Sequence, residues 1–227
     1  MFDLYVVTDS SLSGGRSDAE LARLAYEGGA DAVQLRMKNA DGGEMLAQAR
    51  EIARAAAEMN RLFFVNDRVD VAMASGADGV HLGQSDIPVG DARRLMGDDA
   101  IIGASVQTVG QAVAAVEAGA DYLGVGAVFR TSTKPDAVQG IGLGAVWEIS
   151  RAVDVPVVAI GGINRGNVQD VIRAGADGVA VVSAVVAQED PRGAAHELRD
   201  LILKVRPHVR ELRRRGRAIP ERPRVNL

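Results

Sequence analysis

Gly29-Ala30-Asp31-Ala32-Val33-Gln34-Leu35 is one of four copies of a pattern that decides the fold. In each copy, Gly-Ala-Asp ends a stretch with helical periodicity and is followed by a short apolar run. The other copies begin at Gly76, Gly119 and Gly175. Glycine accepts the left-handed turn that stops a helix, and short apolar runs are typical of strands covered on both faces. The pattern therefore predicts four transitions from helix to buried strand.

Eight strands are expected in all, with helical patterns between most of them. The expected strands are Leu4–Val7, Ala32–Leu35, 62–65, Gly79–Leu82, 100–104, Tyr122–Val125, 155–160 and 178–182. Among the expected helices are 43–59, 109–118 and 164–174. Such alternation predicts a parallel sheet, and eight units in about 205 residues fit an α/β fold of the (β/α)8 TIM-barrel type. A doubly wound open sheet is the alternative, but residues 8–15 lack the G-x-G-x-x-G spacing expected after its first strand.

Composition places the chain among ordinary globular proteins. It has 227 residues, of which 47% are hydrophobic and 25% charged, and it contains no cysteine. Disulfides and thiolate metal sites are therefore excluded. The N-terminal residues run directly into a strand pattern, and no apolar run reaches the length of a membrane span. We expect a cytoplasmic protein with no membrane partner.

Positive charge is concentrated at the C-terminal end. Residues 204–227 contain nine Lys/Arg and two Glu, a net charge of about +7. Because the formal net charge of the whole chain is −4, residues 1–203 carry a net charge of about −11. A basic segment can bind nucleic acid, but no aromatic residues are interleaved here for base stacking. We interpret residues 1–205 as one catalytic barrel domain and residues 206–227 as a flexible basic extension, without a nucleic-acid partner.

The ends of the expected strands carry the chemistry, because active sites of such barrels lie on the loops that follow the strands. Gln34, Arg36 and Lys38 alternate along one strand and should share a face, which indicates an anion site. Asp67 and Asp86 follow two neighbouring strands, so their carboxylates can converge on one Mg²⁺ ion. Capping of the helices that follow them is the alternative for both aspartates.

A second group of residues indicates a phosphate site. Gly161-Gly162 and Val182-Ser183 follow the last two expected strands, where barrels often bind phosphate through backbone N–H groups. His81 lies in mid-strand and is interpreted as a packed or hydrogen-bonded side chain, and Trp147 as a core residue. Neither a Ser/His/Asp triad nor a general-base histidine emerges at the strand ends, so the predicted site works electrostatically.

These residues closely resemble the thiamine-phosphate synthase family, also called thiamine-phosphate pyrophosphorylase. The resemblance spans residues 4–190 and begins at Leu4–Val7 with Thr8-Asp9. Its motifs are Gln34-x-Arg36-x-Lys38, Val65-Asn66-Asp67, His81-Leu82-Gly83-Gln84-x-Asp86, Gly103-x-Ser105, Thr131-x-Thr133-Lys134, Gln139-Gly140, Gly161-Gly162-Ile163 and Val182-Ser183. Met37 stands where the family often has Glu, and its side chain should point away from Gln34 and Arg36.

The resemblance implies a transferase that joins 4-amino-2-methyl-5-hydroxymethylpyrimidine diphosphate to 4-methyl-5-(2-phosphoethyl)thiazole, giving thiamine phosphate and diphosphate. It implies that Gln34 binds the aminopyrimidine and that Mg²⁺ is the cofactor, held by Asp67 and Asp86. The implied diphosphate ligands are Arg36, Lys38, Asn66, Ser105 and Lys134. The implied thiazole-phosphate ligands are Thr131, Ser132, Thr133, Gly162, Val182 and Ser183. Lys134, Arg36 and Lys38 would assist catalysis through charge alone.

Two other functions stay open at this point. A thiazole tautomerase would share the barrel and the phosphate site, but it would have no use for Asp67, Asp86 and the surrounding cations. A non-catalytic binding protein would act through the basic extension. The sequence also leaves open whether the thiazole substrate is carboxylated, with CO2 loss after coupling, and whether the chain forms a homo-oligomer.

Overall fold

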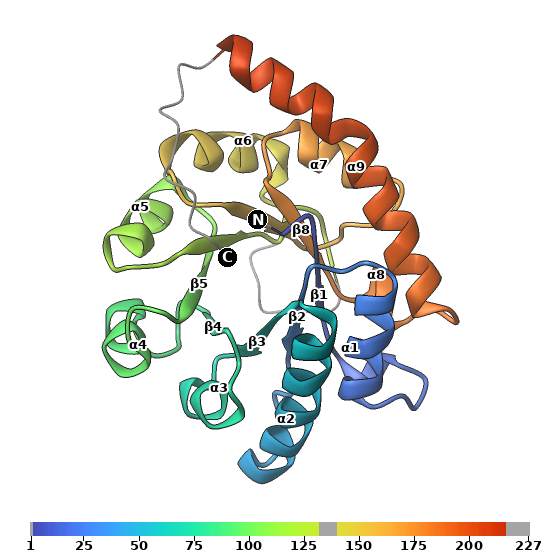
Figure 1. Cartoon of the computed structure of the whole chain (residues 1–227). Helices are drawn as coiled ribbons and strands as arrows, with labels where there is room; N and C mark the ends of the chain where they lie inside the picture. Colours follow the sequence, from blue (N-terminus) through green and yellow to red (C-terminus); the bar gives the residue numbers. More distant parts are fainter. Residues whose placement is uncertain (1, 132–139, 217–227) are drawn as a thin grey trace.

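Eight parallel strands close into a barrel, and each strand pairs with its neighbours in sequence (Figure 1). The computed structural model describes residues 2–131 and 140–216, with side chains up to residue 206. The strands are β1 (Leu4–Val7), β2 (Ala32–Leu35), β3 (Leu62–Asn66), β4 (Gly79–Leu82), β5 (Ile101–Val106), β6 (Tyr122–Val125), β7 (Val157–Ile160) and β8 (Gly178–Val181). Pairing of β1 with both β2 and β8 closes the ring. The predicted TIM barrel is confirmed.

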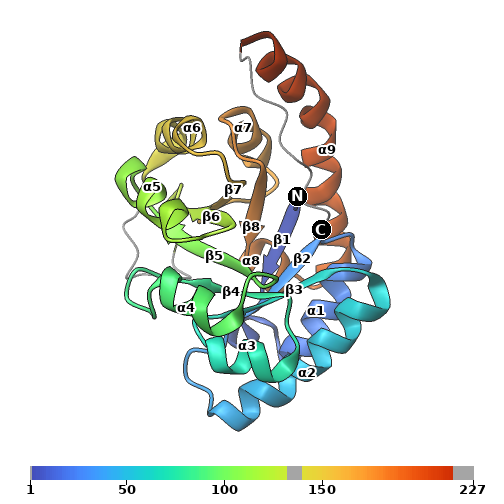
Figure 2. The ribbon, with the colours of Figure 1, turned by 60° about the vertical axis from the view of Figure 1, so that its left-hand side comes forward.

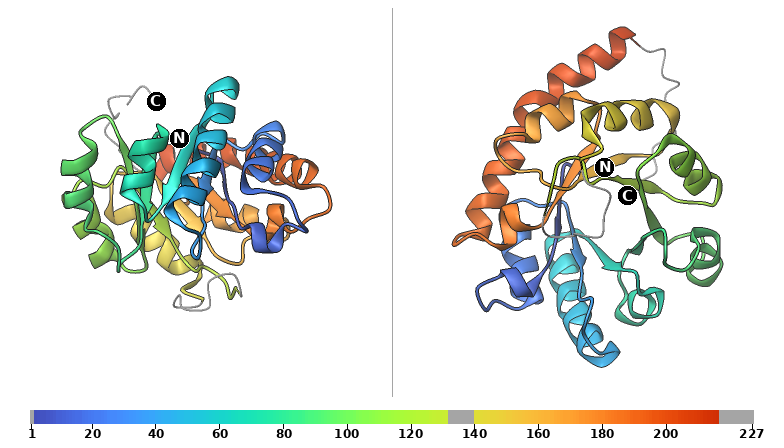
Figure 3. Two further views of the ribbon diagram at one scale, coloured as in Figure 1. Left: turned by 90° about the horizontal axis from the view of Figure 1, so that it is seen from below. Right: turned by 180° about the vertical axis from the view of Figure 1, so that it is seen from behind.

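Helices surround the strands on the outside (Figure 1; Figure 3). They are α1 (Asp18–Glu27), α2 (Gly42–Met59), α3 (Val69–Ser75), α4 (Val89–Met96), α5 (Val109–Glu117), α6 (Gly142–Ala152), α7 (Val168–Arg173), α8 (Ser183–Val186) and α9 (Pro191–Gly216), with a short 3-10 turn η1 (Ser10–Leu12). α7 begins four residues later than the pattern predicts. The side chain of Asn167 accepts the Asn164 N–H, and that of Asn164 accepts the Gly166 N–H, so residues 164–167 form a turn.

Apolar side chains form two separate cores, as strand alternation requires. The outer core lies between barrel and helices and takes alternate strand residues such as Val33, Phe63 and Ile102. The inner core lies inside the barrel and contains Phe2, Tyr5, Val7, Ala32, Phe64, Ile101, Tyr122, Val158 and Ala180. Phe2, Tyr5, Phe64 and Tyr122 pack ring against ring with centroids 5.2–6.1 Å apart. This aromatic layer fills the interior below the strand ends.

Trp147 does not belong to either core, which makes its interpretation as a core residue wrong. α6 buries Val146 and Ile149, whereas Trp147 is 52% exposed on the outer face. The guanidinium carbon of Arg151, one helical turn later, lies 4.9 Å from the centroid of the Trp147 ring. Helical spacing alone did not reveal which face of α6 meets the barrel.

The Gly-Ala-Asp repeat holds the lower ends of the strands together. Its four glycines have φ between 72° and 111°, the left-handed turn that the sequence predicts. Each following aspartate gives its N–H to the carbonyl of a residue in the preceding strand, and its carboxylate accepts the N–H of that same residue. These pairs are Asp31 with Leu4, Asp78 with Phe63, Asp121 with Ile102 and Asp177 with Val157. The repeat thus joins β1 to β2, β3 to β4, β5 to β6 and β7 to β8.

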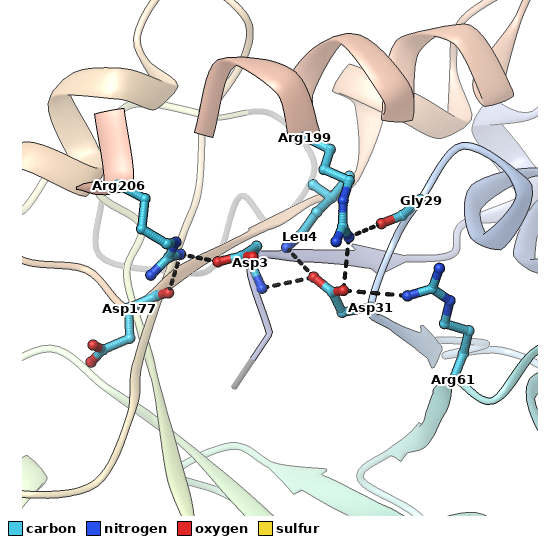
Figure 4. Close-up of polar contacts among 8 residues, drawn as sticks. All are labelled: Asp3, Leu4, Gly29, Asp31, Arg61, Asp177, Arg199 and Arg206. Atoms are coloured by element: carbon cyan, nitrogen blue, oxygen red, sulfur yellow. Dashed lines mark hydrogen bonds and ion pairs between the residues drawn. The ribbon is translucent and has the colours of Figure 1, made fainter. Parts of the chain in front are cut away.

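α9 is anchored to the same end of the barrel by two arginines (Figure 4). Arg199 Nη1 lies 2.7 Å from Asp31 Oδ1 and also donates to the Gly29 carbonyl. Arg206 forms an ion pair with Asp3 and donates to the Asp177 carbonyl at 2.6 Å. α9 packs against α1, α7 and α8, and its C-terminal end projects past the other helices (Figure 2).

The basic C-terminal segment therefore begins inside a helix. α9 continues from Pro191 to Gly216, through the boundary at residue 205 that the charge pattern suggested. Arg206, the first residue of the predicted extension, is only 8% exposed. None of the helices in the described part of the chain combines the length and apolar character needed to cross a membrane.

We predict that Asp31→Ala lowers the free energy of unfolding by about 3 kcal/mol, because it removes charge-assisted hydrogen bonds and leaves Arg61 and Arg199 without their shared carboxylate. Asp31 accepts from the N–H groups of Asp3 and Leu4 and pairs with Arg61 and Arg199. Urea unfolding measures the loss. Asp99→Ala, on an exposed loop, is the control, and equal stability of the two variants would contradict a special role for Asp31.

Candidate active site

Polar side chains from four neighbouring strands line the upper interior of the barrel. Gln34, Asn66, His81 and Ser105 lie on β2, β3, β4 and β5. Asn66 pairs in register with His81, and Ser105 lies two residues after Gly103, the register partner of His81. Gln34 is only 5% exposed, above the aromatic layer. These residues form a polar layer between the aromatic layer and the mouth of the barrel.

Arg36 and Lys38 extend this polar surface beyond the end of β2. The strand ends at Leu35, so these two residues lie on the loop that follows it. Met37 packs against the outer core, which confirms that it points away from Gln34. Arg36 Nη1 lies 3.2 Å from Asp9 Oδ2, with both side chains about one-sixth exposed. Asp9 follows β1 and holds the guanidinium at the mouth, a role that the sequence analysis missed.

Asp67 and Asp86 come together, as predicted from their positions after adjacent strands. Burial and the neighbouring Asp86 carboxyl raise the pKa of Asp67 from 3.8 to about 6. The charge of Lys38 and a hydrogen bond from Asn66 partly oppose this rise in the pKa. Asp67 has a φ of 64°, which is rare for a residue other than glycine. The loop thus places a carboxylate where another carboxylate repels it.

Helix capping does not explain either aspartate. α3 begins after Arg68 and α4 after Pro88, and neither helix has a side-chain cap hydrogen bond. The Asp86 carboxylate instead accepts the N–H of Gly83 at 2.6 Å, within its own loop. The capping alternative is therefore wrong for both residues.

The donor set fits a hard divalent cation. Mg²⁺ takes one or two carboxylates and fills its other positions with water or phosphate oxygens. A cation between Asp67 and Asp86 would offset both the burial of the Asp67 charge and its repulsion by Asp86, the two causes of the raised pKa of Asp67. Within residues 2–131 and 140–206, no group of three or more His, Cys, Asp or Glu side chains could hold a metal ion. A site completed by a phosphorylated ligand is consistent with this pair.

The ends of β7 and β8 form a backbone surface on the other side of the mouth. Gly161 and Gly162 have φ of 103° and 66°. An added Cβ at Gly162 would lie 2.7 Å from the Arg130 carbonyl oxygen, so the loop after β6 packs directly on this backbone. Ser183 begins α8 after Val182. Thr131 is described and partly buried, whereas Ser132, Thr133 and Lys134 lie outside the described residues.

Tyrosines inside the barrel connect the polar residues, which the sequence analysis did not anticipate. Gln34 Nε2 donates to Tyr5 Oη at 2.9 Å, and Tyr5 Oη lies 3.1 Å from Tyr122 Oη. His81 bonds Tyr122 Oη through Nδ1 and Ser105 Oγ through Nε2, each at 2.9 Å. His81 is thus a hydrogen-bonded side chain, as predicted. Tyr5 and Tyr122 are in phase with inward-facing strand residues, and that phase is the signal that could have identified them.

Comparison with known proteins identifies the family of this chain. The sequence matches the family model described as thiamine monophosphate synthase over residues 4–185. The chain belongs to this family. A thiamine-phosphate synthase from Methanoculleus marisnigri is 54% identical over 201 residues, which cover 88% of this chain and 95% of that protein. One from Methanoregula boonei is 52% identical over 211 residues, covering 93% and 98% of the two chains.

A solved structure shows the same architecture. The thiamine phosphate pyrophosphorylase from Pyrococcus furiosus superposes with a TM-score of 0.83 at 46% identity, covering 89% of this chain and 96% of that one. A 3-hexulose-6-phosphate synthase, 19% identical with a TM-score of 0.64, shares the fold alone. The resemblance to the thiamine-phosphate synthase family that the strand-end motifs indicated is therefore confirmed.

We predict that Asp67→Asn raises the thermal stability of the metal-free protein at neutral pH. Because the folded-state pKa of Asp67 is about 6 rather than 3.8, its ionised form lowers the free energy of unfolding. The gain from Asn is absent below pH 3.8 and complete above about pH 6, and it amounts to about 1 kcal/mol because solvent screens part of the repulsion. Asparagine also tolerates the left-handed backbone.

Thermal unfolding at several pH values, with a chelator present, measures this effect. Asp70→Asn is the matched control, because a hydrogen bond from Arg68 holds the pKa of Asp70 below its ordinary value. Removing that carboxylate should therefore bring no gain in stability at neutral pH. A destabilised Asp67→Asn protein at pH 8 would contradict a net cost of the ionised Asp67 carboxylate from burial and from repulsion by Asp86.

Proposed function

We propose that this chain is a thiamine-phosphate synthase that joins 4-amino-2-methyl-5-hydroxymethylpyrimidine diphosphate to a thiazole phosphate and releases diphosphate. The observation that carries the proposal is the pair of facing carboxylates, Asp67 and Asp86, beside a cationic loop. The raised pKa of Asp67 indicates a site that favours a cation. Arg36 and Lys38, close in sequence and near the same mouth, favour an anion. A metal-bound diphosphate satisfies both demands.

The diphosphate would be held by side chains that neutralise its charge as it departs. We assign this role to Arg36, Lys38, Asn66, Ser105 and Lys134. Asp9 orients the Arg36 guanidinium through the 3.2 Å ion pair. Electrostatic stabilisation of a leaving group is most effective when its donors are already in place. In this proposal the protein supplies no nucleophile, because the aminopyrimidine itself stabilises the methylene cation that remains.

Asp67 and Asp86 would hold Mg²⁺. When bound there, Mg²⁺ would act as a Lewis acid that neutralises negative charge on the diphosphate oxygens. The Gly83 N–H keeps the Asp86 carboxylate in its loop, and the left-handed backbone of residue 67 aims the other carboxylate.

The second substrate would bind on the opposite side of the mouth. Its phosphate would contact Thr131, Ser132, Thr133, Gly162, Val182 and Ser183. Gly162 lets the backbone approach phosphate oxygens closely, because it carries no side chain. The barrel would then hold the thiazole nitrogen near the methylene carbon, so that the two fragments react as neighbours.

We predict that purified protein forms thiamine phosphate from both substrates only when Mg²⁺ is present. Asp67→Ala, Asp86→Ala and Lys134→Ala should each lower kcat by two orders of magnitude or more, roughly the loss typical of removing one electrostatic group. Product formation measured by chromatography checks the proposal. Asp70→Ala is the control, since Asp70 is exposed and pairs with Arg68 outside the strand ends. Near-normal turnover of all three variants at saturating Mg²⁺ would refute the assignment.

We predict a separate effect at the thiazole side. Gly162→Ala forces a Cβ within 2.7 Å of the Arg130 carbonyl oxygen and the Phe129 Cβ, at a φ of 66°. The KM for the thiazole phosphate should rise by about tenfold or more, whereas the KM for the pyrimidine diphosphate should change little. Gly144→Ala, where an added Cβ meets nothing within 4 Å, is the control. Equal effects on both substrates would contradict a local phosphate site.

A further inference from the structure

A continuous chain of hydrogen bonds crosses the interior of the barrel below the proposed site. It runs from Gln34 through Tyr5, Tyr122 and His81 to Ser105, with each link between 2.9 and 3.1 Å. Its members come from β2, β1, β6, β4 and β5. Only its two ends belong to the residues proposed to contact the pyrimidine diphosphate. We call these five residues the relay.

Two glycines in the barrel wall make room for the relay. A Cβ at Gly103 would lie 2.2 Å from Tyr122 Cζ and 2.5 Å from His81 Nδ1. A Cβ at Gly124 would lie 2.7 Å from His81 Cε1. Glycine in a strand interior weakens the strand and marks a place where another group approaches closely. Here the approaching groups are the rings of the relay.

Counting donors gives the relay one direction. Gln34 Nε2 donates to Tyr5 Oη, and each phenol has a single O–H. If Tyr122 also donated to Tyr5, the Tyr5 O–H would remain without an acceptor in the buried interior, which is costly. Tyr5 therefore donates to Tyr122, and Tyr122 donates to His81 Nδ1. Burial raises the pKa of both phenols, so both keep their protons.

The direction determines what each end offers to a ligand. His81 accepts at Nδ1, so its neutral ring carries the proton on Nε2 and donates to Ser105 Oγ. The Ser105 O–H is then left to donate, which suits an anionic oxygen. At the other end, Gln34 keeps its carbonyl oxygen and its second amide N–H. An anion at Ser105 and the orientation of the Gln34 amide therefore favour each other.

We propose that Tyr5, Tyr122 and His81 are positioning residues that fix the orientation of the Gln34 amide and thereby select an amino over an oxo substituent on the pyrimidine. This inference rests on the proposed function. A 4-aminopyrimidine presents an N–H donor beside a ring-nitrogen acceptor. The fixed amide meets them with its carbonyl oxygen and its second N–H. A 4-oxopyrimidine presents the reverse order and would require the amide to turn over.

Turning the amide would force the whole relay to reverse. Tyr5 would then face the Gln34 carbonyl and would have to reverse its O–H, which forces reversal at Tyr122, a change of tautomer at His81 and loss of the donor at Ser105. The reversed relay pairs every buried group of the protein, but the anionic oxygen at Ser105 loses its donor, and a site that leaves a hydrogen-bonding group of the ligand unpaired rejects that ligand strongly. Discrimination between amino and oxo rings is thus set by residues that need not contact the ring.

Tyr122→Phe tests this directly, because it removes one hydroxyl and keeps the ring that packs against Phe2, Tyr5 and Phe64. The measured quantity is the competitive inhibition constant of the 4-oxo analogue of the pyrimidine diphosphate, divided by the KM of the amino substrate. We expect this ratio to fall by about tenfold or more, the value of roughly one hydrogen bond. The intrinsic reactivity of the analogue does not enter, because it acts as an inhibitor.

Tyr26→Phe is the matched control. Its hydroxyl is also buried, but it donates to the Leu62 carbonyl outside the relay. The ratio should stay at the wild-type value in this variant. An unchanged ratio in Tyr122→Phe, or an equal fall in both variants, would overturn the proposal. A wild-type protein that forms no thiamine phosphate would instead refute the proposed function.

A second measurement does not depend on activity. Nitrogen chemical shifts of His81 in the wild-type protein, with inorganic diphosphate and Mg²⁺ added, report which ring nitrogen carries the proton. The chain has only three histidines, and loss of the signal in His81→Asn assigns it. We expect protonated Nε2 and unprotonated Nδ1. A proton on Nδ1 in the diphosphate-bound protein would show that the relay runs the other way and would overturn the proposal.

Discussion

Reciprocal hydrogen bonds between four aspartates and four strand residues hold the base of this barrel, and the rest of the structure depends on them. Parallel strands start with N–H groups that have no partner within their own strand. The repeat supplies a carboxylate at alternate junctions, next to a glycine that ends the preceding helix. Each copy therefore stops a helix, starts a strand and fixes its register to the previous strand. At Asp31 the same carboxylate also anchors α9 through Arg199.

This arrangement separates stability from chemistry along the barrel axis. Charges at the base are paired, as Arg206 is with Asp3. At the mouth, Asp67 lies beside Asp86 with a left-handed backbone, and both features cost stability. A well-bonded base allows the mouth to keep an arrangement that is unfavourable until a cation or substrate binds. The aromatic layer of Phe2, Tyr5, Phe64 and Tyr122 lies between the two ends and closes the interior.

Sequence patterns predicted the fold and most of the residues at the mouth, because both follow from periodicity along one strand or loop. The register-setting role of the repeated aspartates was not predicted, since it depends on which strand start lies beside each junction. The role of Asp9 was missed and Trp147 was misjudged for a related reason: their surroundings come from residues distant in the chain, Arg36 for Asp9 and the barrel face that α6 covers for Trp147. The relay was missed because each of its links joins two different strands. The only signal of the relay within single strands was the presence of Gly103 and Gly124, two glycines flanked by apolar residues inside strands.

The relay also explains why a barrel interior tolerates polar side chains at all. A buried hydroxyl or imidazole without a partner would cost more than an apolar residue in its place. Here each member bonds the next, so the polar layer costs little only as long as all links are intact. In a network of this kind, reversing the donor and acceptor of one hydrogen bond requires the same reversal in every other bond. Whether Ser105 donates or accepts a hydrogen bond therefore depends on the orientation of the Gln34 amide, and the reverse is also true. Recognition of the pyrimidine ring at Gln34 is thus coupled to recognition of the anion at Ser105 through the core of the barrel.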